Sequence, residues 1–106
     1  MTRQTVYTRQ RTADEEQLVR RVAATIRVIA AARGMSLADV ERATGLSHEV
    51  VVYVAGGIRE PTLVEVHRIA QAMGSTVLEV VTADPERLAA DNGVNRSVLE
   101  GRGYGW

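Results

Sequence analysis

Residues 35–61 read MSLADVERATGLSHEVVVYVAGGIREP and contain two short helix-compatible runs, one on either side of Gly45. Each run begins with a serine, Ser36 or Ser47, whose side-chain oxygen can accept a hydrogen bond from a backbone N–H group at a helix start. Gly45 can adopt the positive φ that ends one helix and lets the next leave at a steep angle. Two helices joined by so short a turn form a helix-turn-helix, which often places its second helix in the major groove of DNA.

The composition indicates one small domain with an aliphatic core. The chain has 106 residues, 45% of them hydrophobic, with no Phe and no Cys. Without cysteine, neither disulfides nor thiolate metal sites can hold the fold, which favours an intracellular setting. No stretch has the apolar character of a signal peptide or the length of a membrane span. We therefore expect a cytoplasmic protein that does not bind membranes.

The net charge of the chain does not indicate a nucleic-acid partner, but the distribution of the charged residues along the chain is informative. The formal net charge is zero, whereas nucleic-acid binders are usually basic. All basic side chains are arginine, and Arg3, Arg9 and Arg11 precede the first acid, Asp14. Residues 1–12 are predicted to be a flexible basic arm that follows phosphates or enters a minor groove. A solvated tail is the alternative interpretation.

A long helix is predicted before the motif, at residues 13–33. Thr12 and Glu15 have the spacing of a capping box, and Gly34 is suited to end the helix. The apolar side chains at helical spacing are Leu18, Val22, Ile26 and Ile29. Four arginines lie largely off that stripe: Arg20, Arg21, Arg27 and Arg33.

Short helices are also predicted after the motif. Gly56 and Gly57 end the helix at 47–55, and capping boxes start the next two. The first of these runs to Met73, with the inward side chains Leu63, Val66, Ile69, Ala70 and Met73, and the second runs from Thr76 to Val81. Asp84-Pro85 begins a sixth helix, and a glycine-punctuated tail follows.

These patterns predict an all-α fold, a compact bundle of five to six short helices around a central helix-turn-helix. Three segments are expected in the chain. Residues 1–12 form the arm, residues 13–82 form the helix-turn-helix domain, and residues 83–106 form a C-terminal helix and tail. The last segment is a candidate for dimerisation or for binding a partner.

The stretch 18–82 resembles the lambda-repressor-like, Cro/CI-type family of helix-turn-helix proteins, also called the xenobiotic-response-element family. The resemblance runs without a gap from Ser36 to Gly74. The residues that carry it are Gly34-Met35-Ser36, Val40, Gly45-Leu46-Ser47, Val51, Val54, Gly57, Pro61-Thr62-Leu63, Ile69-Ala70 and Ala72-Met73-Gly74.

This resemblance implies a sequence-specific DNA-binding transcription regulator, such as a phage repressor or an antitoxin-like autoregulator. It implies a homodimer on a palindromic operator in double-stranded DNA, with helix 47–55 inserted into the major groove. The positions that would contact bases are Ser47, His48, Glu49, Val52 and Tyr53. The positions that would contact phosphates are Ser36 and Arg59, to which the arm adds Arg3, Arg9 and Arg11.

The chain departs from the family pattern within the motif. Leu37 replaces a frequent Gln, and Glu41 replaces an Ala or Gly, so this carboxylate must bend out to solvent or spread the two helices. Helix 47–55 contains no Arg, Lys, Asn or Gln, and therefore lacks the side chains that read guanine and adenine through paired hydrogen bonds. The alternative is a protein-interaction module that uses Val52 and Tyr53 to bind a toxin, a polymerase subunit or another regulator.

Catalytic and metal-binding patterns are not evident in the sequence. His48 and His67 lack the neighbouring acids or histidines that a metal site needs. No nucleophile–base arrangement, paired carboxylates or phosphate-binding glycine loop rises above chance. We therefore expect neither an enzyme nor a cofactor.

Overall fold

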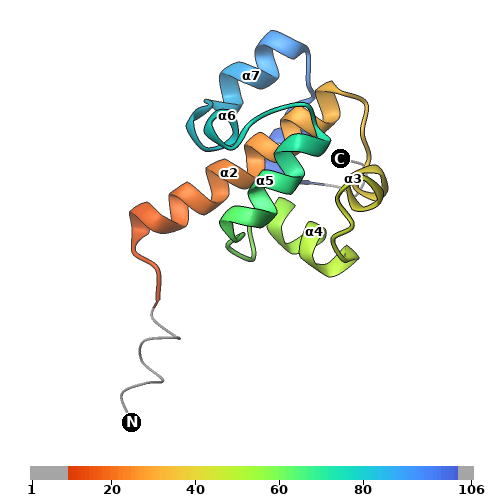
Figure 1. Cartoon of the computed structure of the whole chain (residues 1–106). Coiled ribbons are helices and arrows are strands. Elements are labelled where there is room, and N and C mark those ends of the chain that lie inside the picture. Colours follow the sequence, from red (N-terminus) through yellow and green to blue (C-terminus); the bar gives the residue numbers. More distant parts are fainter. Residues whose placement is uncertain (1–9, 103–106) are drawn as a thin grey trace.

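Seven helices make up the part of the chain that the computed structural model describes, residues 10–102 (Figure 1). They are α2 (Ala13–Ala32), α3 (Leu37–Thr44), α4 (His48–Ala55), α5 (Leu63–Ala72), α6 (Val77–Thr82), α7 (Pro85–Asn92) and α8 (Arg96–Glu100). This range contains no strand. The predicted all-α bundle is confirmed, with one helix more than expected.

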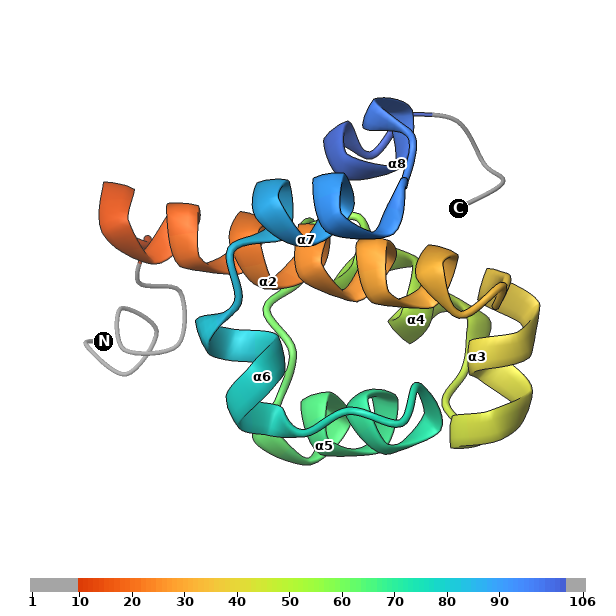
Figure 2. The same ribbon diagram turned by 90° about the horizontal axis from the view of Figure 1, so that it is seen from above.

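Helix α2 lies at the centre of the bundle. Every residue from 22 to 30 is buried, which requires neighbours on all sides of the helix. Figure 2 shows α7 and α8 on one side of α2, with α5 and α6 on the other. The main core cluster consists of Val22, Ile26, Ile29, Ala30, Val40, Val51, Val54, Ala55, Val66, Ile69, Ala70, Met73 and Val80.

The predicted helix starts are confirmed by their hydrogen bonds. In α2, α3, α5 and α6 the residue before the helix accepts from the backbone N–H three positions on, and the acid at that position accepts in return. These capping boxes pair Thr12 with Glu15, Ser36 with Asp39, Thr62 with Glu65, and Thr76 with Glu79. Asp84 caps α7 ahead of Pro85.

Helix α8 lies where a glycine-punctuated tail was predicted. Its start is capped by Asn95, whose Oδ1 accepts from the backbone N–H of Ser97 at 2.9 Å. Gly101 ends it with a φ of 76°. Because α8 has five residues, it is too short for a periodic apolar pattern to reveal it.

Three side chains are placed differently from their predicted positions. Leu63 was expected to face inward but is 73% exposed, because the core contacts of α5 begin one turn later, at Val66. Leu18 is 46% exposed for the corresponding reason at the start of α2. Arg27, which lies off the apolar stripe, is buried, and its guanidinium bonds to carbonyls at the ends of α4 and α8.

Candidate nucleic-acid interface

Helices α3 and α4 form the two-helix unit predicted from the sequence. Gly45 has a φ of 74° and its N–H donates to the carbonyl of Glu41 at 2.9 Å, which closes α3. Val40, Val51 and Val54 are buried, and Leu46 packs against the same cluster. These four apolar side chains therefore join the two helices to the bundle.

The first turn of α4 faces outward. Ser47, His48, Glu49 and Tyr53 are exposed, whereas Val52 is half-buried. The Ser47 hydroxyl accepts from the backbone N–H of Val50 at 3.2 Å and so caps the helix. The structure brings the five predicted base-contacting residues together at one end and along one flank of α4, and their role in reading bases stays a prediction.

Glu41 and His48 form a contact across the turn. The Nδ1 atom of His48 lies 2.6 Å from Oε2 of Glu41. The Glu41 side chain is 23% exposed and the His48 side chain 72% exposed, so the contact is at the surface. The Glu41 carboxylate was expected either to bend out to solvent or to spread the two helices. In the structure it turns outward and contacts His48, the first residue of α4.

Arg59 is engaged by a carboxylate of the same chain. Its Nη1 and Nη2 donate to the two oxygens of Glu65 at 2.7 Å and 3.0 Å, in the paired geometry that guanidinium and carboxylate prefer. The Arg59 guanidinium, the Thr62 N–H and the Thr62 hydroxyl lower the pKa of Glu65, against the effect of burial. Hydrogen bonding to Glu65 raises the pKa of Arg59. Arg59 must therefore leave the Glu65 carboxylate before it can make the predicted phosphate contact.

The remaining predicted phosphate contacts have different surroundings. The Ser36 hydroxyl accepts from the N–H of Asp39 at 3.1 Å and is exposed at the start of α3. Arg11 pairs with Glu16, with Nε 2.7 Å from Oε1. Arg3 and Arg9 lie outside the described residues.

Acidic side chains outnumber basic ones within the motif. Residues 35–61 contain four carboxylates and two arginines. Arg42 contacts Asp39 within α3, although 71% of its side chain is exposed. Arg20 of α2, 73% exposed, lies beside Gly57 at the C-terminal end of α4. Arg20 and Arg42 are therefore basic groups near the motif that the family pattern did not assign.

Arg27 is a functional candidate that the sequence did not single out. It is 6% exposed, and it donates from Nη1 to the carbonyl of Ala55 at 2.7 Å. It also donates from Nε to Val98 at 2.8 Å and from Nη2 to Leu99 at 2.6 Å. Burial lowers the pKa of Arg27, whose ordinary value is high enough to keep it charged. One signal existed: in VAATIRVIAAA, residues 22–32, only Thr25 and Arg27 are polar.

An apolar groove lies between α2, α5 and α6. It encloses about 400 Å³ and includes the exposed side chains of Leu18 and Leu63. Its other apolar walls are Val19, Val22, Pro61, Val66 and Val81. The outer parts of Leu18 and Leu63, which the helical pattern placed in the core, therefore border this groove.

Across residues 10–102, no three His, Cys, Asp or Glu side chains are grouped as a metal ion would require. No helix in the same range is both long and apolar enough to cross a membrane.

Comparison with known proteins adds no relative. No protein-family model, curated protein or solved structure matches the chain.

Proposed function

We propose that this protein is a DNA-binding regulator that inserts α4 into the major groove. The observation that carries the proposal is the division of α4 into two faces. Val51 and Val54 are buried, while Ser47 and His48 at the start of the helix and Tyr53 near its C-terminal end face outward. A short helix held this way presents its first turn to base edges, as a recognition helix does.

The outward side chains favour a particular kind of contact. Glu49 can accept from the amino group of cytosine, and Val52 can contact the methyl group of thymine. His48 and Tyr53 supply hydrogen bonds with little discrimination among bases. Phosphate contacts would come from the Ser36 hydroxyl, from Arg42 of α3, from Arg20 beside the end of α4, and from Arg59 once it leaves Glu65. We further expect a homodimer on a palindromic operator.

The test is selection of bound duplexes from a random-sequence pool, together with the DNA upstream of the protein's own gene. Binding is measured by fluorescence anisotropy at increasing salt. The log of the association constant should fall linearly with the log of the salt concentration. The double variant His48→Ala/Tyr53→Ala should bind the selected site about 10- to 100-fold more weakly. If no duplex binds at low salt, the proposal is wrong.

A matched control lies on the outer face of α5. His67 and Arg68 are exposed there and lie outside the two-helix unit. The variant His67→Ala/Arg68→Ala removes the same number of side chains from the surface. It should change the affinity for the selected site by less than about threefold, because surface substitutions away from a contact have small effects.

A second candidate is favoured by the apolar end of α4. Tyr53 is 43% exposed and Ile58, just after the helix, is 67% exposed. Together with the excess of carboxylates in the motif, these side chains suit a protein partner better than a polyanion. Under this proposal Val52→Asp and Tyr53→Ala abolish retention of that partner, and if they weaken only DNA binding this second candidate is wrong.

A further inference from the structure

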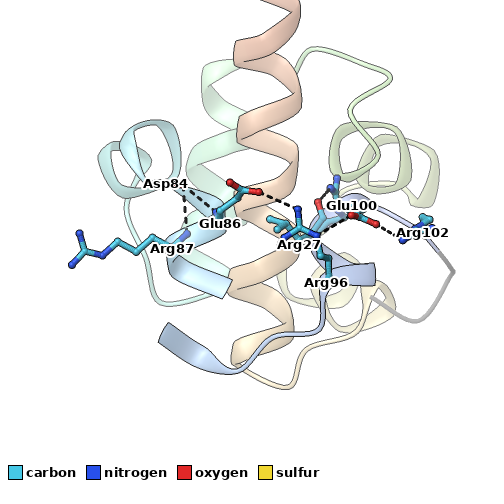
Figure 3. Close-up of polar contacts among 8 residues, drawn as sticks. Arg27, Asp84, Glu86, Arg87, Arg96, Glu100 and Arg102 are labelled. Atoms are coloured by element: carbon cyan, nitrogen blue, oxygen red, sulfur yellow. Dashed lines mark hydrogen bonds and ion pairs between the residues drawn. The ribbon is translucent and has the colours of Figure 1, made fainter. Parts of the chain in front are cut away.

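The C-terminal ends of α4 and α8 meet at one side chain of α2. Arg27 donates to Ala55, the last residue of α4, and to Val98 and Leu99 in the last turn of α8. Figure 3 draws Arg27 together with Arg96 and Glu100, which belong to α8. Carbonyl groups at helix C-termini lack partners within their helix and carry partial negative charge, so they suit a buried cation.

We propose that Arg27 is a positioning residue for α4, and that it holds α4 only while α8 supplies the other acceptors. A buried guanidinium must satisfy several N–H donors at once. Loss of the carbonyls of Val98 and Leu99 would remove two of its acceptors and open that side of α2 to water. The guanidinium would then turn toward water, and its hydrogen bond to Ala55 would break.

At the end of α4, Arg27 supplies a hydrogen-bond donor to a carbonyl for which the following backbone provides none. The carbonyls of Val52, Tyr53 and Val54 accept from the N–H groups of Gly56, Ile58 and Gly57, all within the next five residues. Ala55 accepts instead from Arg27, at a separation of 28 residues. The end of α4 is thereby fixed relative to α2 and, through the same guanidinium, relative to α8.

On the other side, α8 is the element most easily released. None of its five residues is buried. Its surface ion pairs join Arg96 to Glu86 and to Glu100, and Glu100 to Arg102 (Figure 3). Exposed pairs of this kind contribute little to stability. Elements with few buried contacts open at lower free energy than the core, so α8 is expected to open first.

A glycine beside Arg27 allows a test without changing α2 or α4. Gly101 has a φ of 76°, and a Cβ atom built there would lie 3.1 Å from Cζ and 3.2 Å from Nη2 of Arg27. Gly101→Ala should therefore push the end of α8 away from the guanidinium. Gly34→Ala is the matched control, because Gly34 has a φ of 68° and no atom lies within 4 Å of its Cβ position.

The measurement is amide hydrogen exchange of the full chain without DNA. The reporting amides are those of Gly57, Ile58 and Arg59, which close the end of α4. In Gly101→Ala they should exchange roughly tenfold faster than in Gly34→Ala, since a hydrogen bond to a charged group has been lost. Core amides such as that of Ile69 should exchange equally in the two variants once global stability is matched. Equal rates at the α4 end, or a uniform rise across the core, would overturn the proposal.

Arg27→Lys provides a second variant, which replaces the planar guanidinium and its five N–H donors by an ammonium group with three. It should accelerate exchange at the same three amides relative to Gly34→Ala, and failure to do so also counts against the proposal. The exchange result does not depend on DNA binding. If the unaltered protein does not bind DNA, only the proposed function is contradicted. If exchange at the end of α4 is the same in Gly101→Ala and Gly34→Ala, only this inference is contradicted.

Discussion

The guanidinium of Arg59 and the carboxylate of Glu65 are joined by two hydrogen bonds, of 2.7 Å and 3.0 Å. Glu65 also accepts from the N–H of Thr62 at 2.9 Å and completes the cap of α5. One carboxylate thus starts α5 and neutralises an arginine in the loop after α4. In the proposed function, that arginine contacts phosphate only after it leaves Glu65.

We predict that Glu65→Gln strengthens DNA binding. Glutamine can keep the capping role, but it has no charge with which to hold Arg59. The released guanidinium should add about one phosphate contact and increase the salt dependence of log K by about one. Anisotropy titrations across a salt series measure both effects. Glu79→Gln, at the same capping position of α6, is the control, and an equal gain in that variant would refute the explanation.

Stability should fall as the pH is lowered through the acidic range. The Arg59 guanidinium lowers the pKa of Glu65, hydrogen bonds from Ser36 lower that of Asp39, and the Ser75 hydroxyl lowers that of Glu79. Their stabilising effect is complete above the ordinary carboxyl values of about 4 and is lost as the pH falls through the lower folded-state values. Urea midpoints from pH 6 to pH 2, followed by circular dichroism, should decrease accordingly. A flat profile would contradict the prediction, and Glu65→Gln should reduce the slope.

Thr25→Val is expected to stabilise the protein. Thr25 is fully buried in α2, and its Oγ1 has no hydrogen-bond partner among the described residues. Replacing an unsatisfied buried hydroxyl by a methyl group should raise the free energy of unfolding by about 1 kcal/mol. Denaturant unfolding measures the change. Thr25→Ser keeps the hydroxyl and loses a methyl group, so it should be destabilising.

Two apolar residues of α5 should respond very differently to truncation. Ile69 is 1% exposed and belongs to the core cluster, so Ile69→Ala should cost about 2–5 kcal/mol. Leu63 is 73% exposed, so Leu63→Ala should change stability by less than about 0.5 kcal/mol. Thermal and urea unfolding of both variants check this. Comparable losses would indicate that Leu63 packs in the core, as its position in the helical pattern suggested.

The sequence by itself determined where most helices begin and end. Capping boxes such as that of Thr12 and Glu15 depend on hydrogen bonds between residues three positions apart, so a short stretch contains all the information they need. Gly45 similarly marks the turn within the motif through its own backbone conformation. Val51 and Val54 lie three positions apart and therefore share one face of α4, which is its buried face.

Only the tertiary structure decided how the polar residues are used. The Arg27 guanidinium bonds to carbonyls 28 to 72 positions away, and no local pattern specifies such partners. It is buried where α2 meets α8 and the end of α4, whose carbonyls accept its hydrogen bonds. Leu63 is exposed because the packing of α5 begins only at Val66. Local hydrogen bonds set the helices, whereas packing between distant segments decided which charged groups are held within the fold.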